Sequence, residues 1–208
     1  RYPNYSGQPP RIEEGNGDIR GLRGTRVEIE LFASKPLESA TVVIDDSVRL
    51  QTEVLDVQAR VDVDIESSGS YSIELRDRFG INNRNPIRYS IHAIDDNFPQ
   101  VTLTQPGQDM DLSDNMAMPL TIEAVDEYGI SEMTMLYNIN ESGLRSLPLK
   151  FKPGTDVRVG LDWDLSRWDL LPEDLVRYRV TVFDNDAVSG PKKSSTPEYL
   201  LRFPSLQE

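Results

Sequence analysis

The sequence contains no cysteine and a single histidine, which excludes several classes of covalent, metal and catalytic site. Without cysteine it has no disulfide bond, no zinc–thiolate site and no thiol nucleophile. With His92 as its one histidine and no G-x-S-x-G motif, it shows no Ser-His-Asp or Cys-His arrangement. It has no glycine-rich phosphate-binding loop either. We therefore expect no catalytic residues and no bound cofactor, which means a protein that is not an enzyme.

Basic residues are also few, at 22 against 35 acidic residues, and the net charge is −13. Such a surface repels phosphates, so we expect no nucleic-acid partner and no adsorption to an anionic membrane. No apolar run approaches the roughly 18–20 residues of a membrane-spanning helix, so we expect no direct membrane insertion of this part of the chain. The charge fits an extracytoplasmic or cation-associated surface, and a role in solubility explains it equally well.

The sequence contains an internal repeat. Residues 27–44 align with residues 120–137 without a gap, at a constant offset of 93. Most aligned positions keep their apolar or polar character. The identical pairs include Ile29 and Ile122, Glu30 and Glu123, and Thr41 and Thr134. A repeat as long as one small domain indicates two tandem copies of one unit.

The pattern within the repeat is that of β-strands. Apolar residues alternate with Arg26, Glu28 and Glu30, as in an antiparallel sheet that is packed on one side. Turn signals such as Lys35-Pro36 follow at short intervals, which is typical of a β-sandwich. The sequence therefore predicts an all-β chain of two tandem immunoglobulin-like β-sandwich domains, residues 1–97 and 98–208.

The predicted strands of the first domain are 9–14, 17–22, 25–33, 39–45, 48–54, 57–65, 70–77 and 87–95. Those of the second are 100–105, 118–126, 131–139, 146–151, 156–162, 175–184 and 197–203. Between the domains, Pro99 predicts a stiff linker.

The second copy carries an insertion before its Tyr178 strand. Residues 71–77 align with residues 178–184 at an offset of 107, so this copy has 14 more residues than the first. The insertion falls around residues 161–172 and holds both tryptophans. We expect it to pack at the corner of the sandwich, with the Tyr178 hydroxyl bonded back to the backbone. The alternative is a sugar platform or glycosidase centre that uses Asp162, Asp164 or Asp169 beside tryptophan.

Two acidic clusters are candidate calcium sites, because calcium takes six to eight oxygen ligands. Asp95, Asp96 and Asn97 precede Phe98-Pro99 and resemble the cadherin linker. Asp184 and Asp186 alternate in a loop that ends at Gly190, but Ser195 stands where an EF-hand has its bidentate glutamate. Asp77 and Asp126 could add further oxygens. The alternative for all of them is the ordinary use of Asp and Asn in turns.

Motifs spread over nearly the whole chain resemble one protein family. They are Tyr5-Ser6-Gly7-Gln8-Pro9-Pro10, Gly17-Asp18-Ile19, Gly24-Thr25-Arg26-Val27, Lys35-Pro36-Leu37, Asp126-Glu127-Tyr128-Gly129-Ile130, Asp184-Asn185-Asp186-Ala187-Val188-Ser189-Gly190-Pro191-Lys192 and Arg202-Phe203-Pro204-Ser205-Leu206. The chain resembles the periplasmic immunoglobulin-like region of a family of large, uncharacterised membrane proteins of Gram-negative bacteria, known as a domain of unknown function. The resemblance implies a parent with amino-terminal membrane helices and a long helical segment after these modules. Residues 204–208 would lead into that helix, with Ser205 as N-cap.

These observations predict a non-enzymatic extracytoplasmic module of a bacterial cell-envelope membrane protein. We expect it in the periplasm, as part of a membrane-anchored protein, where it would space or dock a protein partner through strand edges or an inter-domain groove. The alternative function is a calcium-stiffened adhesive or glycan-binding tandem sandwich. A third is an accessory region of an enzyme, or a hydrolase.

Overall fold

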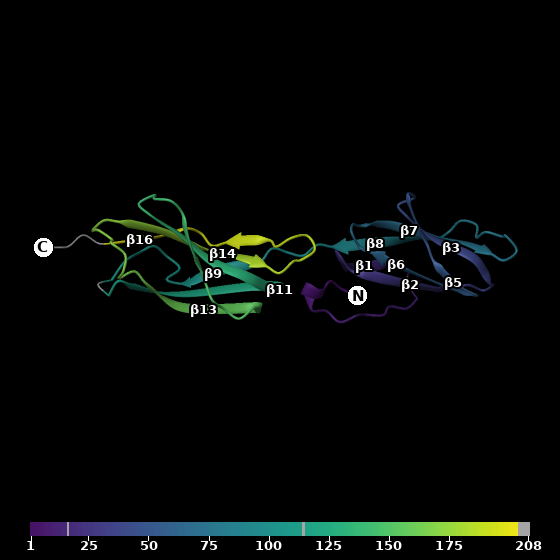
Figure 1. Cartoon of the computed structure of the whole chain (residues 1–208), viewed down its shortest axis with the longest axis horizontal. Coiled ribbons are helices and arrows are strands. Elements are labelled where there is room, and N and C mark those ends of the chain that lie inside the picture. Colours follow the sequence, from purple (N-terminus) through teal and green to yellow (C-terminus); the bar gives the residue numbers. More distant parts are fainter. Residues whose placement is uncertain (16, 114, 204–208) are drawn as a thin grey trace. The chain divides into compact units, whose positions relative to one another are not determined.

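The computed structural model describes residues 1–15, 17–113 and 115–203, which form two compact units, Arg1–Asp96 and Asn97–Glu208 (Figure 1). The predicted fold class is confirmed, because both units are immunoglobulin-like β-sandwiches and the only helix in the described parts is the short 3₁₀ turn η1, Asn4–Ser6. The predicted helix lead-in at residues 204–208, including Ser205, lies outside the described residues.

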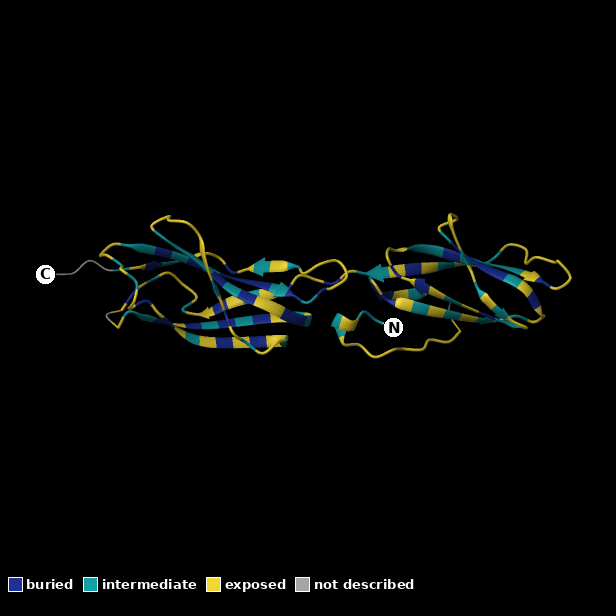
Figure 2. Cartoon of the chain, viewed as in Figure 1, coloured by how far each residue is buried: buried dark blue, intermediate teal, exposed yellow. Residues whose placement is uncertain are grey.

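Unit 1 consists of two sheets, one of five strands in the order β1-β8-β7-β3-β4 and one of three in the order β2-β6-β5. The strands are β1 (Ile19–Leu22), β2 (Arg26–Phe32), β3 (Leu37–Ile44), β4 (Val48–Gln51), β5 (Glu53–Leu55), β6 (Gln58–Asp64), β7 (Gly69–Asp77) and β8 (Arg88–Ile94). Strand β1 runs parallel to β8, and the other pairs are antiparallel. Buried and exposed residues alternate along the strands (Figure 2), so that one face of each sheet packs on the core.

The core of unit 1 is centred on Val42, Ile65, Tyr71 and Ile91. The Tyr71 hydroxyl donates a hydrogen bond to the carbonyl of Gly17 at 2.5 Å, which ties the segment before β1 to strand β7. Burial raises the pKa of Tyr71 to about 12, and the neighbouring Tyr89 and Asp18 add to the effect. The phenol is therefore neutral and available as a donor throughout the physiological range.

Unit 2 forms its two layers around one long bent strand, β11. Its strands are β9 (Gln100–Gln105), β10 (Met110–Asp111), β11 (Ala117–Ile139), β12 (Arg145–Pro148), β13 (Gly154–Asp164), β14 (Leu175–Asp184), β15 (Lys193–Ser195) and β16 (Tyr199–Arg202). The first half of β11 pairs with β9 and β13, and the second half pairs with β12 and β14. Strand β11 therefore passes from one layer of the sandwich to the other.

The bend in β11 lies where the sequence predicted a gap between two strands, at residues 127–130. One carboxylate oxygen of Asp126 accepts the backbone N–H groups of Tyr128 (2.8 Å) and Gly129 (2.7 Å). Gly129 has a φ of 138°, which side-chain-bearing residues rarely adopt. The register shifts between Val125 and Ile130, so the bend carries the chain into the second layer without a loop.

The strand predicted at residues 9–14 is wrong, because this segment is exposed and has no regular structure. Pro9 and Pro10 have no N–H group to donate to a ladder, which removes two backbone hydrogen bonds from any strand that contains them. Strands β10 and β15 were not predicted, since they are only two and three residues long.

Candidate interaction surface

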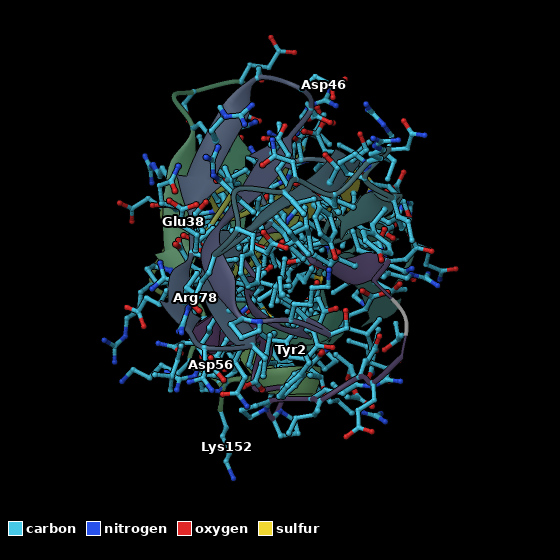
Figure 3. The ribbon with its side chains drawn as sticks, turned by 90° about the vertical axis from the view of Figure 1, so that its right-hand side faces the viewer. Tyr2, Glu38, Asp46, Asp56, Arg78 and Lys152 are labelled. Carbon is cyan, nitrogen blue, oxygen red and sulfur yellow. The ribbon has the colours of Figure 1, made fainter. Side chains whose placement is uncertain are left out.

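Three connections of unit 1 meet at one end of the sandwich, and we call the residues that meet there the loop end: residues 32–37, 55–58 and 77–82. Backbone hydrogen bonds join them, from Leu37 N–H to the Asp56 carbonyl (2.8 Å) and from Arg78 N–H to the Pro36 carbonyl (3.3 Å). Figure 3 looks onto this end and labels Arg78 and Asp56, whose side chains form an ion pair at 3.4 Å. Since the loops are bonded to one another, the loop end is a connected surface.

Large apolar side chains are exposed on this surface. The exposed fraction is 67% for Phe32, 75% for Leu55, 85% for Phe79 and 61% for Ile81. Phe32 and Leu55 are both cross-strand neighbours of Gln58, so they lie in one row across the three-stranded sheet. Single exposed apolar residues are ordinary, but four on neighbouring strand ends and turns form a feature that is typical of an interaction site.

The turn that carries Phe79 is held in place by a buried carboxylate. Asp77 accepts the backbone N–H groups of Phe79 and Ile81, both at 2.9 Å, on the same oxygen. Gly80 between them has a φ of +78°. The backbone N–H of Asp77 also donates to the Ile81 carbonyl at 3.0 Å, which closes the turn. The exposed position of Phe79 is thus fixed by hydrogen bonds, and a partner would not have to order the turn on binding.

The rest of the β7–β8 connection folds back along strand β7. The Asn83 side chain accepts the N–H of Leu75 and donates to the carbonyl of Ile73, both at 2.8 Å. A shallow cavity of about 380 Å³ lies beside this fold, lined by residues that include Thr41, Leu75, Asn83 and Pro86. An ion pair of Arg76 with Glu38 (2.8 Å) lies at its border. The lining of this cavity is mostly polar, since Ser39, Glu74 and Asn82 also belong to it.

Asp95 of the first predicted calcium cluster forms an ion pair with an arginine. Its carboxylate accepts the Nε of Arg23 at 2.7 Å, and Asp96 next to it is buried. Asn97 belongs to unit 2, where its side chain donates to Glu127 at 2.9 Å.

The second predicted cluster holds a lysine. The Nζ of Lys192 lies 2.7 Å from Asp186 and 3.3 Å from Asp184, and both carboxylates are fully buried. The other oxygen of Asp184 accepts the N–H groups of Asp186 (3.1 Å) and Lys192 (2.9 Å). The other oxygen of Asp186 accepts those of Val188 (2.8 Å) and Ser189 (3.0 Å). The ammonium of Lys192 thus supplies the positive charge between the two carboxylates.

Two opposing effects set the ionisation of Asp186. Burial disfavours its charged form, but the hydrogen bond from Lys192 and those from the Ser189 and Val188 amides outweigh burial, and the pKa lies below its ordinary value. Asp186 is therefore a carboxylate at neutral pH, with its negative charge compensated inside the fold.

Calcium binding stays a prediction. Across residues 1–15, 17–113 and 115–203, no three acidic, histidine or cysteine side chains gather as a metal site would require. The turns at Asp77 and Asp126 use their carboxylates for backbone N–H groups, as the alternative interpretation predicted. If Asp95 and Asp96 do bind calcium with a Kd near 10 µM, 1 mM calcium should stabilise the chain by about 2.7 kcal/mol. Thermal unfolding with and without calcium measures this, and no shift, with Asp95→Ala and Asp96→Ala equally without effect, would exclude the site.

The insertion of unit 2 forms part of the core. The Trp163 ring is 4% exposed and lies 5.5 Å from the rings of Tyr137 and Tyr178 and 5.4 Å from that of Trp168. The structure shows the expected packing at the corner of the sandwich. It differs from the prediction for Tyr178, whose hydroxyl donates to the sulfur of Met118 at 3.8 Å and not to the backbone. Buried Trp163 is not available for stacking on a sugar.

The carboxylates of the insertion do not have the properties of a glycosidase pair. Asp162, Asp164 and Asp169 are all exposed. Hydrogen bonds from the side chain and backbone of Ser166 lower the pKa of Asp164, whereas a general acid needs a raised pKa. This segment is better described as the end of strand β13 and a turn, in which Asp164 binds the Ser166 amide at 2.9 Å.

Comparisons with known proteins give likeness in fold only. The comparison with protein-family models and the comparison with curated proteins gave no match. Among solved structures, the chain is similar to the fibronectin(III)-like modules of Clostridium thermocellum CbhA, with 13% identity, 95% of this chain and 96% of that chain covered, and a TM-score of 0.35. It is also similar to DIP-gamma IG1+IG2, with 10% identity, 90% and 94% coverage and a TM-score of 0.31. At these scores the fold assignment rests on the strand pairing described above.

Within the described residues, no helix has the length and hydropathy of a membrane span.

Proposed function

We propose that the chain is a non-enzymatic structural and protein-interaction module in the periplasmic part of a bacterial cell-envelope membrane protein. Immunoglobulin-like sandwiches commonly serve as structural or interaction modules, and function lies in the surfaces grafted on them. The observation that carries this proposal is the loop end of unit 1, with Phe79 exposed on a turn that Asp77 holds in place. The resemblance to large membrane proteins supports the periplasmic location.

The loop end has the chemistry of a protein-binding surface. Its exposed side chains include two aromatic residues, Phe32 and Phe79, with Leu55 and Ile81, and arginine–carboxylate pairs lie beside them. Aromatic and aliphatic side chains at the centre of an interface supply most of its binding free energy. We infer that the partner presents an apolar surface to these four residues.

Replacing Phe79 with serine should separate binding from stability. Phe79 is exposed, so the free energy of unfolding should change by no more than about 0.5 kcal/mol. Loss of a central aromatic side chain should weaken partner binding by at least about 2 kcal/mol, or roughly thirtyfold. Urea unfolding and the recovery of envelope proteins that co-purify with the full-length protein measure the two effects.

Leu144→Ser is the matched control, because Leu144 is a similarly exposed apolar residue in a loop of unit 2. It should leave both stability and co-purification unchanged. The proposal would be wrong if Phe79→Ser and Leu144→Ser gave the same co-purified proteins in the same amounts as the unaltered chain.

A further inference from the structure

Strand β2 of unit 1 and residues 117–125 of β11 occupy the same place in the repeat, but their neighbours differ. In unit 2 this element lies between β13 on one side and β9 on the other. In unit 1, β2 pairs with β6 along its whole length on one side. On its other side, no strand in the described parts of the chain pairs with it. One edge of the three-stranded sheet is thus open.

Burial shows the consequence of this difference. In unit 2 the inward-facing residues Leu120, Ile122 and Ala124 are 2%, 0% and 1% exposed. The residues aligned with them in unit 1, Val27, Ile29 and Leu31, are only half-buried. The sandwich of unit 1 therefore leaves apolar core surface uncovered on the side where unit 2 has β9.

The first residue of the chain is bonded to this open edge. The amino-terminal ammonium group of Arg1 donates to the carbonyl of Arg26 at 2.6 Å, and the backbone N–H of Arg26 donates to the carbonyl of Arg1 at 2.9 Å. A reciprocal exchange of this kind is one hydrogen-bonded pair of an antiparallel ladder. Because backbone groups on one side of a strand recur every second residue, those of Glu28, Glu30 and Phe32 point toward the same open edge.

The segment that follows Arg1 is unsuited to pair as a strand with the open edge of β2. Pro9 and Pro10 cannot donate to a ladder. Glu13 and Glu14 would lie against the exposed carboxylates of Glu28 and Glu30, and like charges opposite each other are destabilising. In an antiparallel pair that places Arg1 opposite Arg26, the residues that precede Arg1 lie opposite the residues that follow Arg26. The polypeptide that could continue the ladder along β2 is therefore the one that precedes Arg1.

We propose that the residues directly preceding Arg1 in the longer parent protein form a strand that pairs antiparallel with β2 and completes the sandwich of unit 1. The Arg1–Arg26 pair fixes the register, so the first, third and fifth residues before Arg1 lie opposite Val27, Ile29 and Leu31 and are apolar. The second and fourth lie opposite Glu28 and Glu30 and are basic or hydroxyl-bearing. This inference rests on the longer parent of the proposed function, but not on its location or on a partner at the loop end.

Hydrogen exchange on the 208-residue chain and on a chain extended by its native preceding residues tests this strand. In the extended chain, the amides of Glu28, Glu30 and Phe32 should exchange at least tenfold more slowly. The amides of Arg49 and Gln51 in edge strand β4 serve as the control and should not change. Unchanged exchange at β2 in the extended chain, or protection that requires a second protein, would overturn the proposal.

A proline variant gives an independent result. Glu28→Pro removes the N–H group that faces the open edge, so it should abolish the added protection at Glu30 in the extended chain while the 208-residue chain keeps its fold. Ile29→Pro removes a bond to β6 and should destabilise both chains. Equal effects of Glu28→Pro on both chains would contradict the strand. The co-purification experiment with Phe79→Ser tests the loop end, and hydrogen exchange tests the added strand. Either proposal can therefore fail without the other.

Discussion

Replacing Lys192 with methionine is expected to lower the free energy of unfolding of unit 2 by about 3–5 kcal/mol near pH 7. The side chain of Lys192 lies between the carboxylates of Asp184 and Asp186, both of which are buried. Methionine of similar length would leave two uncompensated negative charges inside the fold. Urea unfolding followed by tryptophan fluorescence reports on unit 2, because Trp163 and Trp168, the only tryptophans of the chain, both lie in it.

The effect should depend on pH with a definite sign. The pKa of Asp186 is lowered in the folded chain, so its contribution to stability is present above the unfolded value of about 4 and is lost as the pH falls through the lower folded pKa. The difference between the unaltered chain and Lys192→Met should therefore shrink below about pH 4. Lys193→Met is the control, because Lys193 is exposed. Equal stability of the two variants at neutral pH would contradict the buried ion cluster.

Replacing Trp163 with alanine is expected to destabilise unit 2 by about 3–5 kcal/mol, because it leaves a cavity between Tyr137, Trp168 and Tyr178. Trp163→Phe keeps an aromatic ring in the same place and should cost less. Urea unfolding followed by circular dichroism measures both variants.

The same residue distinguishes core packing from glycan binding. In the unaltered chain, the fluorescence of Trp163 should be protected from a soluble quencher such as acrylamide, since the ring is buried. A loss of less than about 1 kcal/mol in Trp163→Ala, together with free access of the quencher, would show that the ring serves a surface role instead. Binding of glycans by other residues stays a prediction.

The repeat and the strands could be predicted from the sequence because they depend on local periodicity. Strand β2 and both halves of β11 could be predicted from their alternating apolar residues. This alternation does not predict that the two halves form one continuous strand of 23 residues. The missing partner of β2 could have been suspected from Pro9 and Pro10, since proline excludes a paired central strand.

The candidate sites depend on contacts that the local sequence pattern does not show. The alternation of Asp184 and Asp186 suggested a cation site, but the cation that the structure places there is Lys192, which reaches them only because the loop folds back. The loop end includes Phe32, Leu55 and Phe79, which come from three separate connections, and none of these residues is informative alone. The one local signal was that Phe79 and Ile81 interrupt an otherwise polar turn.

Photo-crosslinking in the full-length protein, within the cell envelope, tests the central claim most directly. A photoreactive residue at Phe79, and in a second variant at Leu55, should form an adduct of the same mass with one protein. That adduct should be lost when Ile81→Ser is added, and should be absent when the photoreactive residue stands at Leu144. No adduct from either loop-end position, or the same adducts from Leu144, would contradict the assignment of the loop end of unit 1 as an interaction surface.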